Sequence, residues 1–414
     1  MSRRLLLLLA LACGVAVGNI YFPQTVAPLV ASGLRVSPDS ATLVVTAVQF
    51  GYAAGVFLLV PLGDRFPHRP LITILLGLSG LGLLAATVAP TLPLLVGANA
   101  LVGIATVVAP IIGPMAAGLV ADDQRGVVSG TLLSGSIGGM LLSRTAAGTI
   151  GDWWGWRAPY LTAAASVLLI AVVMARVLPA TRPSSGHRYP ALLGEPLRLL
   201  RTEPELRRSC LYQATVFAGF SAVWTGLALL LTSPAYGLGA PAVGMLALVN
   251  AATMLCTPVA GRQVDRRGSD VVNLACLVGV GISAAVLAFA SLGGARGLAA
   301  LVLGTLLLDV AMQSGMVANQ VRNYTLRPEA RSRVNTAYMT CAYLGGSAGS
   351  WLGVRAYAHL GWLGVCGLLA LLAGVALTRH LAMATATRQG PAVVAVEKPD
   401  LRPVRSLGDV RPVD

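Results

Sequence analysis

Two charged side chains occur inside long apolar stretches of the sequence. Asp309, in LLLDVAMQ, is the one acid of sixteen within such a stretch, and Arg144, in LLSRTAAG, is the one basic residue clearly within one. Each charge costs ~2.5 to 3.5 kcal/mol near the centre of a bilayer, so each marks a hypothesis of function. Desolvation favours a protonated carboxyl and a nearby cation disfavours it. We predict that Asp309 is a protonation site and Arg144 a charge that biases it; the alternative is a buried pair that only fixes helix packing.

The composition requires that these two residues be held by membrane helices. The chain has 414 residues, of which 56% are hydrophobic and 11% charged, and a mean hydropathy of +0.75. Soluble domains carry roughly 25% charged residues. Twelve spans of ~20 apolar residues fit in the chain and leave room for short loops, a linker and a tail. A polytopic all-α membrane protein is therefore predicted, and a soluble enzyme, a disulfide scaffold and an outer-membrane barrel are excluded.

Twelve apolar runs define the expected helices. They are 5–31, 41–62, 71–89, 93–120, 127–150, 158–178, 210–232, 242–261, 271–291, 298–322, 334–356 and 361–380. The first run continues past Cys13 to about Ala31, which favours a first membrane helix over a cleaved signal peptide. On this map Asp309 and Arg144 differ by ~8 Å in depth, which is near the reach of an Arg side chain.

The basic residues are distributed asymmetrically between the two sides of this map. Twenty-five of the 30 lie on the side of the N-terminus, and only Arg35, Arg157, Arg296 and Arg355 lie on the opposite side. This bias predicts that both termini are cytoplasmic. It accounts for the net charge of +14 without a nucleic-acid partner.

The two halves of the chain repeat each other. Three landmarks recur in order at offsets of 201, 206 and 206 residues: LGDRFPHR and GRQVDRRG, QRGVV and ARSRV, and Gly155-Trp156 and Gly361-Trp362. Such a repeat is typical of transporters built from two similar bundles. We predict a six-helix bundle at 1–178, a cytoplasmic linker at 179–209 with a short amphipathic helix near 191–200, a second bundle at 210–380, and a disordered tail at 381–414.

These features carry a family resemblance. The GDRxxxR loop after the second helix, its DRRG counterpart after the eighth and the GWR after the fifth resemble the major facilitator superfamily. The segments NIYFPQ, QFGYAAGVFLLVPLGDR and ANQVRNYTLRPEARSRVNTAYM are similar to the drug/proton antiporter branch, and most similar to its purine ribonucleoside efflux group. The resemblance implies twelve transmembrane helices in two pseudo-symmetric six-helix bundles.

The chain departs from the family pattern at sites that bear on coupling. Asn99 stands where many proton-coupled relatives have an Arg in the fourth helix, and Ser143-Arg144 replaces a Gly-Pro pair in the fifth. We predict that the two departures are linked and that Arg144 supplies the charge that the fourth helix lacks. In the GDR loop, Pro67 and His68 replace a Gly and a basic residue, which makes this loop stiffer and less charged.

The resemblance also implies a substrate site, because helices 1, 4, 7 and 10 line the central cavity of the superfamily. Amides beside aromatic rings suit an uncharged or cationic molecule with hydrogen-bonding groups and a flat apolar part. The alternative is that several of these side chains only make interhelical hydrogen bonds. The expected substrate-binding residues, including additions from helices 2 and 8, are Asn19, Tyr21, Gln24, Gln49, Tyr52, Asn99, Gln213, Trp224, Asn250 and Gln313.

The repeated loops suggest a cytoplasmic gate. An acid next to two guanidinium groups can form a latch between helices that slide during alternating access, and the alternative is a solvated loop that only obeys the positive-inside rule. The expected gating residues are Asp64, Arg65, Arg69, Arg125, Asp265, Arg266 and Arg331. The glycines at 135, 138 and 139, and at 345, 346 and 349, are predicted to be close-packing surfaces of helices 5 and 11.

The expected function is export of a drug, natural product or nucleoside-like molecule by proton antiport across a bacterial inner membrane. Proton-coupled or facilitative uptake of a metabolite is the alternative. A membrane enzyme is a remote one, because the four histidines are scattered and none pairs with clustered acids. The expected partners are the substrate, protons and lipid. No cofactor or metal is expected, and a monomer is usual in the family.

Overall fold

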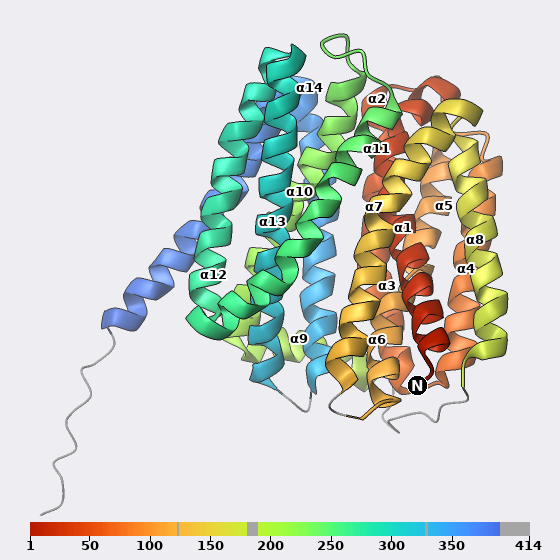
Figure 1. Ribbon diagram of the computed structural model, residues 1–414, viewed down its shortest axis with the longest axis vertical. Helices are drawn as coiled ribbons and strands as arrows, with labels where there is room; N and C mark the ends of the chain where they lie inside the picture. Colours follow the sequence, from red (N-terminus) through yellow and green to blue (C-terminus); the bar gives the residue numbers. More distant parts are fainter. Residues whose placement is uncertain (122–123, 180–188, 328–329, 390–414) are drawn as a thin grey trace, which may run out of the picture. The chain divides into compact units, whose positions relative to one another are not determined.

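The computed structural model describes residues 1–121, 124–179, 189–327 and 330–389, and every regular element in these ranges is a helix (Figure 1). The described residues up to Leu377 form one compact unit, and those from Thr378 to Gln389 belong to another. The predicted tail beyond residue 389 lies outside the described residues. The helices are α1 (Arg3–Leu34), α2 (Pro38–Ala41), α3 (Leu43–Leu59), η1 (Val60–Asp64), α4 (His68–Val88), α5 (Leu92–Ala105), α6 (Val108–Gly118), α7 (Arg125–Trp154), α8 (Arg157–Val177), α9 (Tyr189–Thr202), α10 (Pro204–Thr232), α11 (Ala240–Val249), η3 (Asn250–Leu255), α12 (Cys256–Ala288), η4 (Phe289–Leu292), α13 (Gly294–Leu326) and α14 (Arg331–Gln389).

These elements confirm the twelve predicted spans. Some spans consist of consecutive elements. One span is α5 followed by α6, and another is α11 followed by η3 and the start of α12. Conversely, α12 and α14 each continue across a non-helical glycine, Gly268 at φ 81° and Gly361 at φ 62°, that separates two spans. Within the described residues, nine segments are long and apolar enough to cross a membrane by themselves. The chain is thus an all-α, multi-pass membrane protein with two pseudo-symmetric six-helix bundles.

Glycines allow helices of the first bundle to touch backbone to backbone. A Cβ at Gly139 would lie 1.9 Å from the carbonyl oxygen of Gly14 on α1, and one at Gly135 would lie 2.3 Å from that of Ala10. Small residues permit this approach where lipid offers no hydrophobic drive for helix pairing. The prediction of a close-packing surface on α7 therefore holds for Gly135 and Gly139. It was wrong for Gly138, whose Cβ would meet nothing within 4 Å.

The second bundle repeats this solution between α10 and α14. A Cβ at Gly345 would lie 2.3 Å from the carbonyl oxygen of Ala214, and one at Gly349 would lie 2.0 Å from that of Ala218. Gly346 instead faces the Phe217 ring at 2.6 Å. Almost the whole length of α10 is buried, because other helices surround it on every side. Its side chains are therefore placed to build an internal site.

The two halves meet along α7 with α11 and along α3 with α14. The Thr145 hydroxyl donates to the Gly244 carbonyl at 2.8 Å, and the Ser347 hydroxyl donates to the Thr46 carbonyl at 3.1 Å. Both of these hydrogen bonds run from a small side chain to a backbone carbonyl. They are of the kind that can break and reform when two bundles rock against each other.

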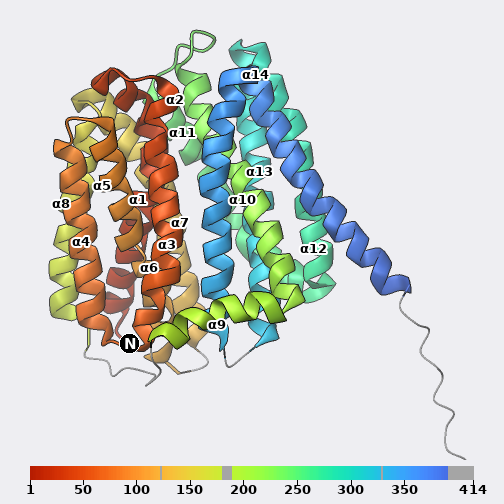
Figure 2. The same ribbon diagram turned by 180° about the vertical axis from the view of Figure 1, so that it is seen from behind.

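The predicted linker helix is confirmed as α9, which crosses the end of the molecule where the N-terminus lies (Figure 2). Its apolar side chains Leu192 and Leu199 are buried, and its polar face carries Glu195, Arg198 and Arg201. Glu195 pairs with Arg333 at 2.9 Å on the second half, whereas the Tyr189 hydroxyl donates to the Leu58 carbonyl at 2.6 Å on the first. The helix thus connects the two halves by contacts as well as by sequence.

Candidate functional site

The two charged residues predicted to be buried lie at the contact of the two halves. Arg144 on α7 and Asp309 on α13 are both 0% exposed, and the Trp224 side chain of α10 links them. The Arg144 guanidinium lies 4.1 Å from the centre of a Trp224 ring, and the indole Nε1–H donates to Asp309 Oδ1 at 3.3 Å. No ion pair of the described residues joins the two directly. The cation, the indole and the carboxylate therefore form one relay.

Arg144 is also contacted by Gln24 and Tyr21 of α1 and by Phe220 of α10. Its Nη2 donates to Gln24 Oε1 at 2.6 Å, and its guanidinium lies 5.1 Å from the Tyr21 ring and 5.7 Å from the Phe220 ring. Stacking on aromatic faces stabilises a guanidinium that has been removed from water. Arginine suits this position better than lysine, because its planar group can stack and donate at the same time.

An aromatic cluster surrounds the relay and draws on four helices. The Tyr21 and Tyr343 hydroxyls are 3.2 Å apart, and the Tyr343 ring lies 4.3 Å from that of Tyr52 and 5.0 Å from that of Phe217. Phe217 stacks in turn on Phe220 at 5.6 Å. Tyr21 and Tyr52 belong to the first half, whereas the other rings belong to the second. The cluster therefore lies across the contact of the two halves.

Several polar atoms of this region have no hydrogen-bond partner among the described residues. They are Nε and Nη1 of Arg144, Nε2 of Gln24, Oδ2 of Asp309, and both amide atoms of Gln49. Buried polar groups are nearly always paired in folded proteins, and leaving one unpaired is costly. Both donors and acceptors are left over here, so the region suits a molecule or water that both accepts and donates hydrogen bonds.

The structure brings six of the predicted residues together: Asp309, Arg144, Tyr21, Gln24, Tyr52 and Trp224. Gln49 lies close by, because a Cβ on Gly346 would be 3.1 Å from its Oε1.

Asn250 and Gln313 form a neighbouring network. Asn250 Nδ2 donates to the Thr305 hydroxyl at 3.1 Å, and Gln313 Nε2 donates to that of Thr253 at 2.9 Å. Thr305 and Gln313 lie one turn on either side of Asp309, on the same stripe of α13.

The remaining predicted binding residues lie apart from the relay. Asn99 accepts from the Tyr160 hydroxyl at 3.3 Å inside the first bundle. Gln213 accepts from the Tyr338 hydroxyl at 2.8 Å and sits eleven residues, or ~16.5 Å, along α10 from Trp224. Asn19 lines a groove on the outer side of α1. Asn99 and Gln213 thus bond between helices, as the alternative expects, whereas Asn19 faces the groove.

Sequence reasoning missed Phe217, Phe220 and Tyr343. The spacing of Gln213, Phe217, Phe220 and Trp224 on α10 is that of one helix face, and it would have identified both phenylalanines. Tyr343 carries no such signal, because none of the predicted substrate-binding residues lies on α14.

The predicted gating residues are spread along the end of the molecule where α9 lies. Arg69 Nε donates to the Ala175 carbonyl at 2.6 Å, and the Arg65 guanidinium lies 5.9 Å from the Phe66 ring. Arg331 Nε donates to the Tyr324 carbonyl at 3.2 Å. Asp64 is the last residue of η1, Asp265 and Arg266 are exposed on α12, and the Arg125 side chain lies outside the described residues.

An ion-pair cluster in the second half was not predicted. Asp270 pairs with both Arg208 and Arg322, and Glu205 lies 3.3 Å from Arg208 and 3.7 Å from Arg322. The cluster joins the start of α10 and the end of α13 to the part of α12 just after its non-helical Gly268. Asp270 follows the DRRG motif by two residues, so it, rather than Asp265, connects this loop to neighbouring helices.

Comparisons with known proteins agree with this architecture. The sequence profile described as Major Facilitator Superfamily matches residues 7–350. The chain is 36% identical over 366 residues to the uncharacterized transporter YgaY of Escherichia coli O157:H7, covering 88% of this chain and 92% of that one. It is 29% identical over 282 residues to a chloramphenicol resistance protein of Streptomyces lividans, covering 66% and 70%. The crystal structure of a mutant of the nucleoside transporter NupG shares the fold at a TM-score of 0.74 and 13% identity, covering 92% and 100% of the two chains.

Proposed function

Because the chain belongs to the Major Facilitator Superfamily and is a membrane transporter rather than an enzyme, we propose that it exports a small organic molecule in exchange for protons. The Trp224-bridged relay of Arg144 and Asp309 carries this proposal. It is a titratable carboxyl and a fixed cation, fully buried where the two halves meet. A site of this kind can be exposed alternately to either side when the bundles rock.

The relay gives a reason for exchange. While Asp309 is ionised, its charge offsets that of Arg144 through the indole, and its free Oδ2 can accept a hydrogen bond from a substrate. Protonation removes that acceptor and leaves Arg144 as an uncompensated cation. Proton and substrate therefore compete for Asp309. One proton moving through 100 mV releases ~2.3 kcal/mol, which is enough for modest uphill export.

The aromatic cluster supports a particular substrate class. Flat rings on both sides of the relay, with leftover donors on Arg144, Gln24 and Gln49, suit a neutral or cationic molecule that contains an aromatic or conjugated part. The name of the Streptomyces lividans relative points to an amphipathic antibiotic of that kind. A nucleoside has the same chemical features. We propose that Gln49, Asn250 and Gln313 contribute further polar contacts next to the rings, whereas Asn99 and Gln213 hold helices together.

We further propose that the end of the molecule carrying α9 faces the cytoplasm of a bacterium and acts as the gate. Both the N-terminus and α9 lie there (Figure 1), together with the GDR loop around Arg65 and Arg69 and the Asp270 ion pairs. Two contacts of α9 reach both halves at this end, Tyr189 with the Leu58 carbonyl and Glu195 with Arg333, and their release would let the halves separate and expose the relay to this side. The proposed domain limits are 1–178, 179–209, 210–380 and 381–414, in a monomer in the inner membrane.

Growth inhibition tests the proposal. An efflux-deficient bacterium would express wild type, Asp309→Asn, or the control Asp39→Asn at matched membrane levels, and would be exposed to chloramphenicol and nucleoside analogues. Asp39 is an exposed acid on α2, so its variant makes the same chemical change away from the relay. Wild type and Asp39→Asn should protect equally, and Asp309→Asn should lose protection. In inverted vesicles, adding the protective compound should dissipate a preformed proton gradient with wild type and Asp39→Asn, but not with Asp309→Asn.

Other outcomes would overturn separate parts of the proposal. Equal protection by Asp309→Asn would make Asp309 a packing residue. Increased sensitivity of cells with wild type would indicate uptake rather than export.

A further inference from the structure

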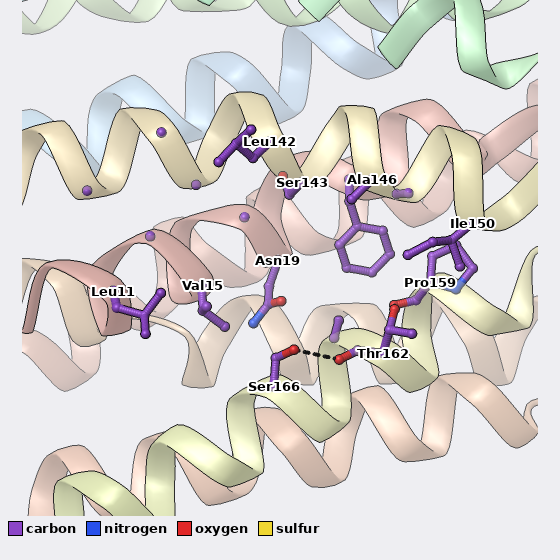
Figure 3. A pocket seen from close by; sticks show the side chains of 18 of the residues that line it. Leu11, Val15, Asn19, Leu142, Ser143, Ala146, Ile150, Pro159, Thr162 and Ser166 are labelled. Atoms are coloured by element: carbon purple, nitrogen blue, oxygen red, sulfur yellow. Dashed lines mark hydrogen bonds between the residues drawn. The ribbon is translucent and has the colours of Figure 1, made fainter. Parts of the chain in front are cut away.

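A groove of about 580 Å³ lies between α1, α7 and α8, on the outer side of the first bundle (Figure 3). Its lining includes Leu11 and Leu142, which are 55% and 60% exposed. Exposed leucines on a membrane helix face hydrocarbon rather than water. The groove therefore opens sideways into the bilayer.

Asn19 projects from α1 into this groove (Figure 3). The side chain is only 3% exposed, and its Nδ2 has no hydrogen-bond partner among the described residues. The hydroxyls of Ser143, Thr162 and Ser166 donate to backbone carbonyls at 3.1, 3.0 and 2.8 Å, and none of them accepts a hydrogen bond from Asn19 Nδ2. The groove thus presents one unused donor within an apolar wall.

The chemistry and depth of the groove restrict what can fill it. None of the residues that line it is charged, so a neutral occupant fits. Asn19 follows Arg3 by 16 residues in a helix of 32, which places it ~24 Å along α1, near mid-bilayer. The ester carbonyls of a phospholipid lie in the interfacial layer, far from this depth. The acceptor for Asn19 therefore belongs to a molecule dissolved in the hydrocarbon core.

We propose that this groove is a second binding site, distinct from the relay, for a neutral and largely apolar molecule that enters from the bilayer and accepts a hydrogen bond from Asn19 Nδ2. Its volume is within the range of small-molecule sites. The two sites share one wall: Asn19 and Ser143 face the groove, whereas Gln24 and Arg144 face the relay. The glycine contacts between α1 and α7 close this wall.

Photolabelling with benzophenone tests the site. This neutral diaryl ketone has one carbonyl acceptor, and its excited carbonyl inserts into nearby C–H bonds under near-ultraviolet light. The full chain would be labelled in vesicles of phosphatidylethanolamine and phosphatidylglycerol, and the adducts located by peptide mass spectrometry. Adducts should concentrate on the groove-lining parts of α1, α7 and α8, and should saturate with benzophenone concentration.

Three variants sharpen the test. Gly138→Leu fills the groove without a clash, because a Cβ there meets nothing within 4 Å. It should lower groove adducts at least about tenfold. Asn19→Leu should raise the half-saturating concentration severalfold while the adducts stay in the groove. Gly77→Leu is the matched control, since Gly77 on α4 is equally open but does not line the groove; it should label like wild type.

Two results would overturn the proposal. One is adduct formation spread over all lipid-facing helices, unsaturable and unchanged in Gly138→Leu. The other is a phospholipid that native mass spectrometry finds on wild type but not on Gly138→Leu, and that benzophenone does not displace. Because labelling needs no transport, neither result depends on whether the relay exchanges protons.

Discussion

At the scale of residues, Trp224 is the centre of the molecule's chemistry. Its ring stacks on the Arg144 guanidinium and its N–H donates to Asp309, so it holds two opposite charges close without letting them pair. A direct buried ion pair would be hard to separate, because each partner alone would be left uncompensated. The proposed exchange requires the carboxyl to gain and lose a proton, which an intervening indole permits better than a direct ion pair would.

Replacing Trp224 by Phe should therefore impair export although a ring is kept. The variant loses a hydrogen bond to a charged acceptor, worth ~1.5–3 kcal/mol. Export of the protective compound from vesicles should fall at least about tenfold. Trp156→Phe is the matched control, because the buried Trp156 Nε1 has no partner among the described residues, and it should export normally. Normal export by Trp224→Phe would show that the N–H to Asp309 has no role.

At the scale of elements, glycine positions decide which helix surfaces touch. Adjacent glycines on α7 differ sharply: Gly139 touches the α1 backbone, whereas Gly138 borders the open groove. In a helix, successive residues point about 100° apart, so neighbours in sequence face different surroundings. The same contrast separates Gly345 and Gly349, which touch α10 backbone, from Gly346, which faces an aromatic ring.

Gly139→Ala should destabilise the protein and Gly138→Ala should not. A Cβ at position 139 would lie 1.9 Å from a backbone oxygen that cannot move aside easily, and overpacking of this kind costs ~1–3 kcal/mol. Thermal unfolding of the two variants in detergent, followed by fluorescence, should show a lower midpoint only for Gly139→Ala. Equal midpoints would mean that α1 and α7 shift apart without cost.

At the scale of the whole molecule, transport requires the halves to move against each other. The α3 to α14 contact is a place to test this, since the Thr46 and Ser350 hydroxyls are 3.5 Å apart across the halves. Ser350 also lies 3.2 Å from the Thr225 hydroxyl, within the second half. One residue thus reports on both kinds of contact.

Disulfide crosslinking at these positions should distinguish the contact between the halves from the contact within the second half. In a background without the six native cysteines, oxidation of Thr46→Cys/Ser350→Cys should stop export, and a reducing agent should restore it. Thr225→Cys/Ser350→Cys should crosslink without loss of export, because both positions belong to one half. Continued export by the oxidised Thr46 pair would contradict rocking at this contact.

Sidedness can be checked with single cysteines. Ser37→Cys and Ser291→Cys, both exposed at the end opposite α9, should react with a membrane-impermeant maleimide in intact cells. Thr202→Cys on α9 should react only after the cells are permeabilised. The reverse pattern would contradict cytoplasmic termini.

The membrane class, the twelve spans, the two halves and the two buried charges could all be predicted from the linear sequence. These follow from apolar length, from repeated loops and from the cost of a charge in hydrocarbon, which are all local properties of the chain. The linker helix was likewise readable, because its amphipathic pattern lies within fourteen residues. Among site residues, Asp309, Arg144, Trp224, Tyr21, Gln24 and Tyr52 were predicted and lie together.

Which polar side chains face one another depends instead on how the helices pack. Asn19 and Gln24 are five residues apart on α1, yet one faces the lipid-side groove and the other binds Arg144. The direction of each depends on where α7, α8 and α10 pack around α1. Tyr343 joins the aromatic cluster, and Trp224 separates the two charges, for the same reason. A long-range contact depends on how several helices pack at once, and no single stretch of sequence contains that information.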